Sequence, residues 1–208
     1  MAIVLACVAA WLLGGVPFGL VLVRVFRGVD IRTIGSGNVG ATNASRAFGG
    51  RLRLPVFFAI YLLDFAKGFV PAAYFGPWFG AGEGVGTMVL VGAAAVLGHC
   101  VSPFLRFKGG KGVATTTGVF GAIEPLALVV ALAVFGVTLA ATRRVFFGSL
   151  ALGLALALTT VLREPATAFG ARWPASALAI AAAIFLFWTH RTNLRAFLGA
   201  RAAGGVPS

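Results

Sequence analysis

The sequence predicts an all-α, polytopic integral membrane protein with seven transmembrane helices, one of them short. Of its 208 residues, 60% are hydrophobic, and its mean hydropathy is +0.99, whereas soluble domains are nearer to half apolar. Apolar runs of roughly 18 or more residues indicate membrane-spanning helices. Basic residues also gather in alternate connections between these runs, a pattern that marks the cytoplasmic side of a membrane protein.

The helices are expected to form in seven apolar runs. These runs are residues 2–23, 54–75, 85–103, 113–122, 125–141, 145–162 and 174–190. The fourth run would span only about 15 Å as a helix, half of the hydrocarbon core. It is therefore expected to be short, to be sunk into the protein, or to extend beyond these limits. We expect Glu124–Pro125 to separate it from the next helix, because proline disfavours helical geometry in the residue before it.

The basic residues orient the chain in the membrane. With seven crossings and the N-terminus outside, fourteen lysines and arginines and the C-terminus fall on the cytoplasmic side, and only Arg163 and Arg172 lie outside. Merging residues 113–141 into one helix would give six crossings and weaken this asymmetry. No basic segment precedes the first run, so we expect a retained helix and not a cleaved signal peptide. Residues 1–200 are expected to form a single membrane-embedded domain, and residues 201–208 a short C-terminal tail.

The charge of the chain limits its partners. The formal net charge is +12, with only five acidic residues. Such a balance can indicate nucleic-acid binding. Here, however, the basic residues lie between apolar runs, so they are expected to set topology and to contact lipid headgroups. No nucleic-acid partner is expected. Cys7 and Cys100 predict neither a disulfide framework nor a metal site. Because the sequence has no carboxylate cluster, no metal is expected either.

A glycine-rich polar loop, GSGNVGATNASRAFGG at residues 35–50, follows the first apolar run. It contains G-x-G-x-x-G, but a dinucleotide site needs a strand before this motif, and here a membrane helix precedes it. The glycines still let main-chain N–H groups approach a ligand closely. Ser36 and Asn38 add polar side chains to the same turn.

The rest of this loop predicts a short helix closed by Gly49–Gly50. Such a helix would bring Thr42, Asn43 and Arg46 to one face, because residues three and four apart are neighbours. This face suits a phosphate or a carboxylate. It equally suits an amphipathic surface helix whose arginine meets lipid headgroups, and the segment alone leaves both possibilities open.

A second loop, FKGGKG at residues 107–112, resembles a phosphate site without being a Walker A motif. Gly112 stands where that motif needs Ser or Thr. Lys108 and Lys111 alternate with glycines, a combination that predicts backbone N–H groups and cationic side chains around an anion. The alternative is a flexible cytoplasmic turn whose lysines set topology. Two such loops on one predicted membrane face favour phosphate binding.

Polar residues in three other segments complete the candidates. In THRTNLRAFLGA at 189–200, His190 and Asn193 are three apart and are expected on one helical face, although His190 could simply anchor the helix at the membrane boundary. Asp64 and Lys67 are expected to form a structural ion pair within a helix, in preference to binding substrate. His99 is expected to make a polar contact at a helix end ahead of the second loop.

The segments GSGNVGATNASRAFG, HCVSPFLRFKGGKGVATTTGV and HRTNLRAFLG resemble, in order and spacing, three signature segments of the bacterial acyl-phosphate:glycerol-3-phosphate acyltransferases (the PlsY type). The resemblance covers the chain to about Gly199. It implies a seven-helix enzyme of the bacterial inner membrane with its active site on the cytoplasmic face. Such an enzyme transfers a fatty acyl group from acyl phosphate to the 1-hydroxyl of glycerol 3-phosphate, without a cofactor, in the first acylation of phospholipid synthesis. A separate soluble enzyme would supply the acyl phosphate.

The resemblance also assigns site residues. It implies five active-site residues: Ser36, Arg46, Lys111, His190 and Asn193. The residues expected to bind substrate are Gly37, Asn38, Thr42, Asn43, Lys108, Gly109, Gly110 and Gly112. No residue stands out as a covalent nucleophile, and acyl phosphate is already activated, so positioning and charge stabilisation could supply most of the catalysis. The proton of the attacking hydroxyl could pass to His190 or to a phosphate oxygen of the substrate.

One segment departs from the family pattern. Where the family usually has R-Y-x-S-L-x-S, this chain reads RRVFFGSL, with Phe146 in the place of the first serine and Ser149 in that of the second. A direct substrate contact by the first serine is therefore in doubt, and Ser149 could substitute only if the backbone shifts.

Two other function classes compete with an acyltransferase. A transporter for a phosphorylated metabolite would need polar residues along a path through the bilayer, and runs such as ALAIAAAIFLFW offer almost none. A purely structural membrane protein would leave both glycine-rich loops unexplained. The oligomeric state and the acyl-chain preference stay open at this stage.

Overall fold

The computed structural model describes residues 1–202, which consist of helices and connecting loops without a strand. The chain forms two compact units, Met1–Pro125 and a second that begins at Leu126. The prediction of a single domain over residues 1–200 stays a prediction. The last helix continues to Ala202, and residues 203–208 of the predicted tail lie outside the described residues.

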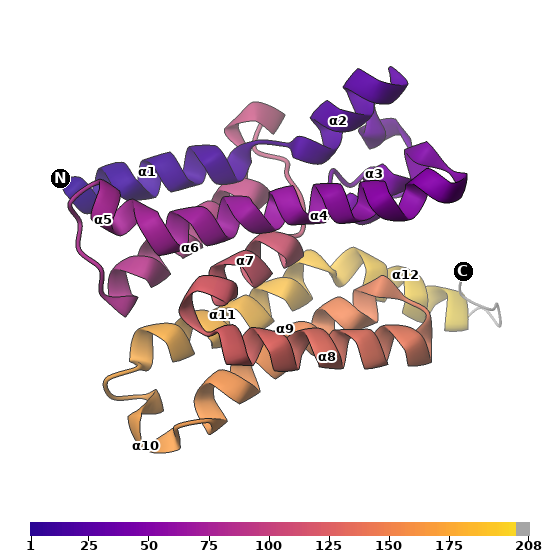
Figure 1. Cartoon of the computed structure of the whole chain (residues 1–208). Helices are drawn as coiled ribbons and strands as arrows, with labels where there is room; N and C mark the ends of the chain where they lie inside the picture. Colours follow the sequence, from indigo (N-terminus) through magenta and orange to yellow (C-terminus); the bar gives the residue numbers. More distant parts are fainter. Residues whose placement is uncertain (203–208) are drawn as a thin grey trace. The chain divides into compact units, whose positions relative to one another are not determined.

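The first unit is built from two closely packed helix pairs, and α1 lies along α6 while α4 lies along α7 (Figure 1). Its main helices are α1 (Ala2–Gly15), α2 (Phe18–Arg27), α4 (Arg53–Val70), α6 (Val85–Cys100) and α7 (Val113–Ile123). Small residues allow the close approach: a Cβ on Gly98 would overlap the Trp11 carbonyl, and one on Gly68 would overlap that of Thr115. Small residues at helix contacts are typical of membrane bundles.

The first predicted run, residues 2–23, is not one continuous helix. It is interrupted at Val16–Pro17, between α1 and α2, because Pro17 has no N–H group to continue the hydrogen-bond ladder. Buried side chains bind the carbonyls at this break. The Ser102 hydroxyl donates to the Gly15 carbonyl at 2.6 Å, and the Lys67 ammonium donates to the Val16 carbonyl at 2.8 Å.

The predicted break between the fourth and fifth runs is confirmed. Glu124 has φ −141° and ψ 68°, which ends α7 at Ile123 after 11 residues. A new helix, α8, begins at Pro125. The chain therefore does not merge residues 113–141 into one helix.

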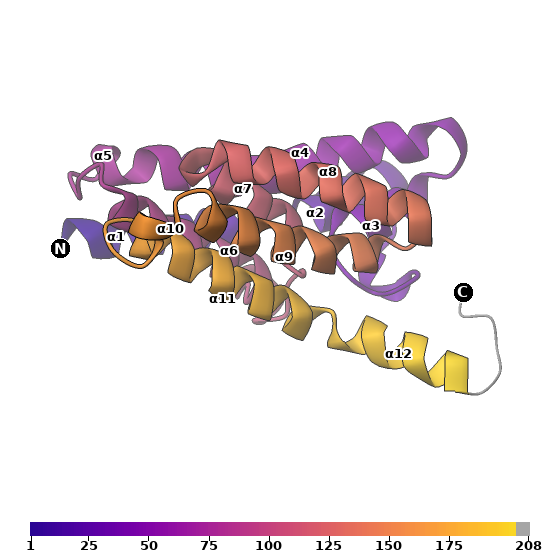
Figure 2. The ribbon, with the colours of Figure 1, turned by 90° about the horizontal axis from the view of Figure 1, so that it is seen from below.

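In its described part, the second unit contains three long apolar helices and two shorter ones. They are α8 (Pro125–Thr142), α9 (Val145–Leu162), α10 (Pro165–Ala168), α11 (Trp173–Thr189) and α12 (Arg191–Ala202). Within this unit α8, α9 and α11 lie side by side (Figure 2). Gly153 allows α9 to approach α11, since its Cβ position lies 3.3 Å from Ala183 Cα. The chain bends by 49° between α11 and α12.

Five helices or helix runs among the described residues are long and apolar enough to cross a membrane, or six if the bent α11–α12 pair counts as one span. Helix α7 is apolar but shorter. The expectation of an all-helical fold built from apolar spans is confirmed, whereas the number seven stays a prediction.

Candidate active site

Both glycine-rich loops rest on the same hydrophobic core of the first unit. This cluster joins residues in and around the first loop to Leu105, which lies just before the second. Its buried members are Val23, Ile31, Val39, Ala41, Ala44, Ile60 and Leu105. Because one core supports both loops, the sequence features predicted to bind phosphate lie at the same end of this unit.

The buried amide of Asn43 holds the first loop in shape. Asn43 is 2% exposed. Its Nδ2 group donates to the carbonyls of Ile31, Ile34 and Asn38 at 3.0, 3.0 and 2.9 Å. Its Oδ1 atom accepts from the Ser36 N–H group at 3.1 Å. The contacts observed for Asn43 thus hold the loop to itself and to the segment before it, and its direct contact with substrate stays a prediction.

The short helix predicted after residue 38 forms as two turns, α3 (Ala41–Ala44) and a 3-10 turn over Ser45–Phe48. Gly49 and Gly50 follow with φ of 35° and 51°, as expected for glycines that close a helix. Arg46 is exposed on this segment, and its Nη1 atom lies 3.1 Å from the Cβ position of Gly35. The guanidinium group therefore reaches back over the glycine turn.

The remaining residues of the first loop complete this surface. Ser36 is exposed and lies next to Gly35, while Gly37 turns the chain with φ 68°. The Asn38 Oδ1 atom accepts from the Gly40 N–H group at 2.9 Å. Thr42 is half-buried. The loop thus presents one guanidinium group and one hydroxyl group on a backbone that internal hydrogen bonds hold rigid.

In the second loop, the backbone N–H groups of Gly109 and Gly110 are engaged within the protein. The Gly109 N–H group donates to the Cys100 carbonyl and the Gly110 N–H group to the His99 carbonyl, both at 3.0 Å. These bonds satisfy carbonyls at the end of α6, which have no partner within the helix. The expectation that the N–H groups from Gly109 to Gly112 together surround an anion is therefore wrong for Gly109 and Gly110.

The donors that remain suited to an anion lie at the start of α7. Gly112 precedes this helix with φ 85°, and the first N–H groups of an α-helix have no acceptor within the helix and attract negative charge. Lys111 is half-buried beside this helix start, and burial lowers the pKa of its ammonium group from the ordinary value. Lys108 is exposed. The charge of the helix start and the lysine suits a phosphate, and phosphate binding here stays a prediction.

A buried ion pair supports the second loop from inside the unit. The Lys67 Nζ and Asp64 Oδ1 atoms are 2.8 Å apart, with side chains 2% and 4% exposed, so the predicted structural pair is confirmed. His99 Nδ1 lies 3.8 Å from the same Asp64 oxygen. A Cβ on Gly110 would overlap the His99 imidazole. No local pattern in the sequence linked His99 to Asp64 or Lys67 to Val16, because these contacts join separate helices.

The last two predicted catalytic residues belong to the second unit. His190 is 3% exposed, and its Nδ1 atom lies 2.8 Å from the Leu186 carbonyl. Since a carbonyl only accepts, this nitrogen carries the proton. Asn193 is half-buried in the first turn of α12. The 49° bend falls at His190, so the two residues do not lie in one continuous helix, and their shared helical face stays a prediction.

The segment that departs from the family pattern forms an aromatic cluster in the second unit. The Phe146 ring lies 4.2 Å from that of Phe147 and 6.0 Å from that of Phe197 in α12, with Arg144 5.0 Å above the Phe197 ring. Ser149 is 2% exposed, and its hydroxyl donates to the Val145 carbonyl at 3.0 Å. Phe146 thus packs against α12, and the Ser149 hydroxyl is used within its own helix.

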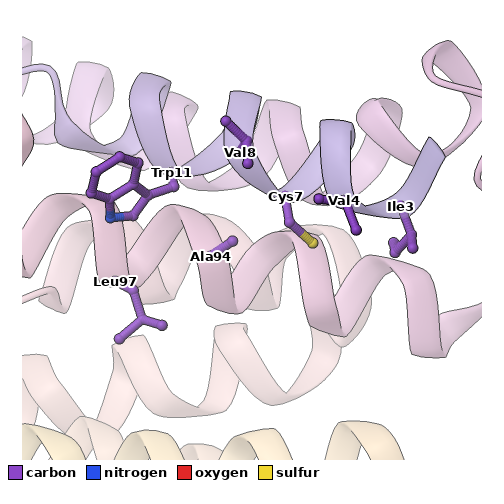
Figure 3. Close-up of a pocket in the computed structure, with 7 residues that line it drawn as sticks. All are labelled: Ile3, Val4, Cys7, Val8, Trp11, Ala94 and Leu97. Carbon is purple, nitrogen blue, oxygen red and sulfur yellow. The ribbon is translucent and has the colours of Figure 1, made fainter. Parts of the chain in front are cut away.

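An apolar groove of about 340 Å³ lies between α1 and α6 (Figure 3). Its lining residues are Ile3, Val4, Cys7, Val8, Trp11, Ala94 and Leu97. None of them belongs to either glycine-rich loop, and the lining has almost no polar surface. The groove suits hydrocarbon and not a phosphate. Within residues 1–202, no group of three or more His, Cys, Asp or Glu side chains could hold a metal ion.

Comparisons with known proteins identify the family. Residues 4–200 match the model of the family described as glycerol-3-phosphate acyltransferase. Two relatives with that name, from Anaeromyxobacter sp. (strain Fw109-5) and Aquifex aeolicus (strain VF5), are each 40% identical to this chain. The first alignment covers 90% of this chain and 88% of the relative, and the second covers 92% and 93%.

Two solved structures share the fold. Both are crystal structures of PlsY (YgiH), described as an integral membrane glycerol 3-phosphate acyltransferase, one in its glycerol 3-phosphate form and one in its lysophosphatidic acid form. The TM-scores are 0.82 and 0.80 at 33% identity, and each comparison covers 97% of this chain and 94% of the other.

Proposed function

The chain belongs to the glycerol-3-phosphate acyltransferase family, and we propose that it transfers a fatty acyl group from acyl phosphate to the 1-hydroxyl of glycerol 3-phosphate. It is an integral membrane acyltransferase, and the lipid product of its reaction is lysophosphatidic acid. Inorganic phosphate would be the second product. This reaction is the first acylation of phospholipid synthesis.

One observation supports this chemistry above the others: two cation-bearing loops rest on one core at the same end of the first unit. Both proposed substrates carry a phosphate group, and the loops offer the Arg46 guanidinium and the Lys111 ammonium beside the start of α7. Arginine and lysine are the side chains suited to phosphate, and a helix start adds backbone donors.

In the proposed mechanism the glycerol phosphate hydroxyl attacks the acyl carbonyl directly. A carbon–oxygen bond forms to the glycerol, the bond to the phosphate oxygen breaks, and phosphate leaves with the electron pair. The hydroxyl proton passes to a base, for which His190 and a substrate phosphate oxygen are the two candidates. Positioning and stabilisation of negative charge supply most of the rate.

The active-site roles follow from the chemistry of each side chain. Lys111 and the start of α7 hold one substrate phosphate, and Arg46 with Ser36 holds a phosphate at the first loop. His190 and Asn193 orient substrate groups, and the Leu186 carbonyl fixes which His190 nitrogen carries the proton. Thr42 and Lys108 border the loops as further substrate contacts.

The proposed setting is the bacterial inner membrane, with seven crossings, the N-terminus outside, and the C-terminus and active site on the cytoplasmic face. Seven crossings require α7 to cross as a short helix and α11 to cross as the last span, with α12 following it on the cytoplasmic side. The distribution of basic residues supports this arrangement. On the cytoplasmic face, both proposed substrates can reach the site from the water side or the lipid interface.

The deciding experiment uses purified protein in detergent with labelled glycerol 3-phosphate and no added cofactor. Palmitoyl phosphate is supplied in one reaction and palmitoyl-CoA in another. We expect labelled lysophosphatidic acid only with palmitoyl phosphate. Product from the CoA thioester would overturn the proposed donor. Uptake of the phosphate ester into sealed vesicles without acyl product would favour a transporter.

A further inference from the structure

The segment between α6 and the second loop has an unusual backbone. Arg106 and Phe107 are consecutive non-glycine residues with φ of 53° and 60°. Bulky residues rarely adopt this left-handed region, and such conformations persist only where surrounding contacts impose them. Here the Phe107 N–H group donates to the Ser102 carbonyl at 2.8 Å, and the Lys108 N–H group donates to the Leu105 carbonyl at 3.1 Å. We call residues 103–108 the hook.

The hook turns one apolar residue inward and presents four side chains outward. Leu105 is 6% exposed and belongs to the core shared by the two loops. By contrast, Phe104 and Phe107 are 57% and 62% exposed, and Arg106 and Lys108 are exposed as well. The strained backbone thus displays two aromatic rings and two cations together.

The position and charge of the hook identify what it contacts. It lies where the apolar stretch Val85–Leu105 ends, which is the level of the lipid headgroups if that stretch spans the bilayer. No acidic residue occurs in the sequence between Glu83 and Glu124, so the hook has no anionic neighbour along the chain. Exposed aromatic rings favour the membrane interface, and clustered basic residues attract anionic phospholipids.

We propose that the hook binds the anionic phospholipid surface of the membrane, with Phe104 and Phe107 in the interface and Arg106 against lipid phosphates. The hook continues directly into Gly109 and Gly110, which are bonded to the end of α6. Lipid binding therefore steadies the segment that leads to Lys111. This inference goes beyond the proposed reaction, and its binding test does not require activity.

The binding test places a tryptophan at the hook and measures its quenching by brominated lipids. Phe104→Trp is reconstituted into vesicles of phosphatidylcholine alone and into vesicles that also contain phosphatidylglycerol. Wild-type protein corrects for the four native tryptophans. We expect additional quenching from the new indole, and we expect it to rise with the content of phosphatidylglycerol.

A charge variant tests the ionic part of the proposal. In the Phe104→Trp background, Arg106→Gly removes the cation while glycine accepts the positive φ without strain. We expect about fivefold more phosphatidylglycerol to be needed for half of the quenching change, the effect of one basic residue near an anionic surface. Arg106→Lys should restore the wild-type requirement. Arg53→Gln, at an exposed arginine in ordinary helical backbone, is the matched control. It should change the required phosphatidylglycerol content less than Arg106→Gly does.

Equal quenching in both kinds of vesicle would overturn the proposal. An unquenched tryptophan at position 104 would also overturn it, because the hook would then not contact lipid and could instead bind a soluble partner. An unchanged lipid requirement in Arg106→Gly would do the same. Acyl transfer is measured separately in the same vesicles. If the wild-type protein shows no acyl transfer while the Phe104→Trp variant still shows lipid-dependent quenching, the result counts against the proposed function and not against lipid binding.

Discussion

At the scale of single residues, Asn43 determines the shape of the first loop through hydrogen bonds in both directions. Its amide donates to three backbone carbonyls and accepts from one backbone N–H group while almost completely buried. Buried polar groups that lose their partners cost about 1–3 kcal/mol each. A change in this one side chain should therefore lower stability and disturb the site together.

We predict that Asn43→Asp lowers the free energy of unfolding by at least about 1–3 kcal/mol. Aspartate still accepts from Ser36, but it cannot donate to the carbonyls and brings a carboxylate against them. Thermal unfolding in detergent measures the change. Asn38→Asp is the matched control for stability, since its oxygen only accepts from Gly40. Equal stability of the two variants would contradict the role of Asn43.

Arg46 and Lys111 are the cations proposed to hold substrate phosphates in the two loops. We predict that Arg46→Ala and Lys111→Ala each lower kcat/KM by about 10²-fold or more, as expected when a charge-stabilising group is removed. Initial rates with palmitoyl phosphate measure the loss, and circular dichroism checks that each variant is folded. Near-normal turnover in a folded variant would show that the side chain is not catalytic.

The protonation of Lys111 predicts a pH dependence. Because burial lowers the pKa of this ammonium group, it loses its charge at a lower pH than an exposed lysine does. If the charged form binds a phosphate, kcat/KM should fall as pH rises through the lowered pKa of the free enzyme. Arginine keeps its charge throughout this range.

We therefore predict that Lys111→Arg, if active, moves the alkaline limb of the pH–kcat/KM profile to higher pH. The profile is recorded with a correction for spontaneous hydrolysis of the donor. Lys108→Arg is the comparison, because Lys108 is exposed. A limb at the same pH in wild type and Lys111→Arg would exclude Lys111 as the group that titrates.

At the scale of elements, the Asp64–Lys67 pair of α4 connects this helix to parts of the first unit that are distant in sequence. Lys67 also binds the Val16 carbonyl at the break between α1 and α2, and Asp64 faces His99 of α6. A buried pair contributes little net stability over apolar residues of similar size, whereas an unpaired buried charge costs about 3–5 kcal/mol.

We predict that Lys67→Met alone destabilises the protein by about 3–5 kcal/mol, and that adding Asp64→Leu recovers much of this loss. The Val16 carbonyl keeps the Phe18 N–H group as a donor in both variants. Unfolding midpoints of wild type, both single variants and the double variant complete the cycle. A double variant less stable than either single variant would mean that the pair itself stabilises the fold.

The elements that sequence could predict are those whose signal is local. Apolar runs located the main helices within a few residues, and Glu124–Pro125 located the end of α7. The sequence did not reveal the break at Val16–Pro17, because apolar residues continue on both sides of Pro17. It also missed the bonds of Gly109 and Gly110, since their acceptors lie at the end of α6. Such contacts depend on how helices pack, and hydropathy does not record packing.

The same limit applies to the candidate site. Glycine, lysine and arginine patterns indicated which loops carry the cations. They could not distinguish a side chain that faces a ligand from one that braces the loop, as Asn43 does. Likewise, the spacing of His190 and Asn193 could not reveal that the helix bends between α11 and α12. The chemistry of the residues was predictable, but their individual contacts required the structure.

At the scale of the whole molecule, the orientation of the chain depends on whether α7 crosses the membrane. If it crosses, the connection after α9 lies outside and α12 is cytoplasmic, on the same side as the first loop. If it does not, every later connection changes side. The 11 residues of α7 cover only about 16 Å, so its crossing requires burial in protein or a locally thinner bilayer.

We predict that α7 crosses, because only then do the basic residues of the second unit other than Arg163 and Arg172 lie on the cytoplasmic side. Single cysteines at Arg51, Gly82, Arg163 and Arg195, in a chain without Cys7 and Cys100, report the sides to a membrane-impermeant maleimide. Gly82→Cys and Arg163→Cys should react from outside, and Arg51→Cys and Arg195→Cys only from the cytoplasmic face of inverted vesicles. If Arg163→Cys instead reacts from the cytoplasmic face and Arg195→Cys from outside, α7 does not cross. His190 and Asn193 would then lie near the membrane face opposite Arg46, and one active site built from all four residues could not form.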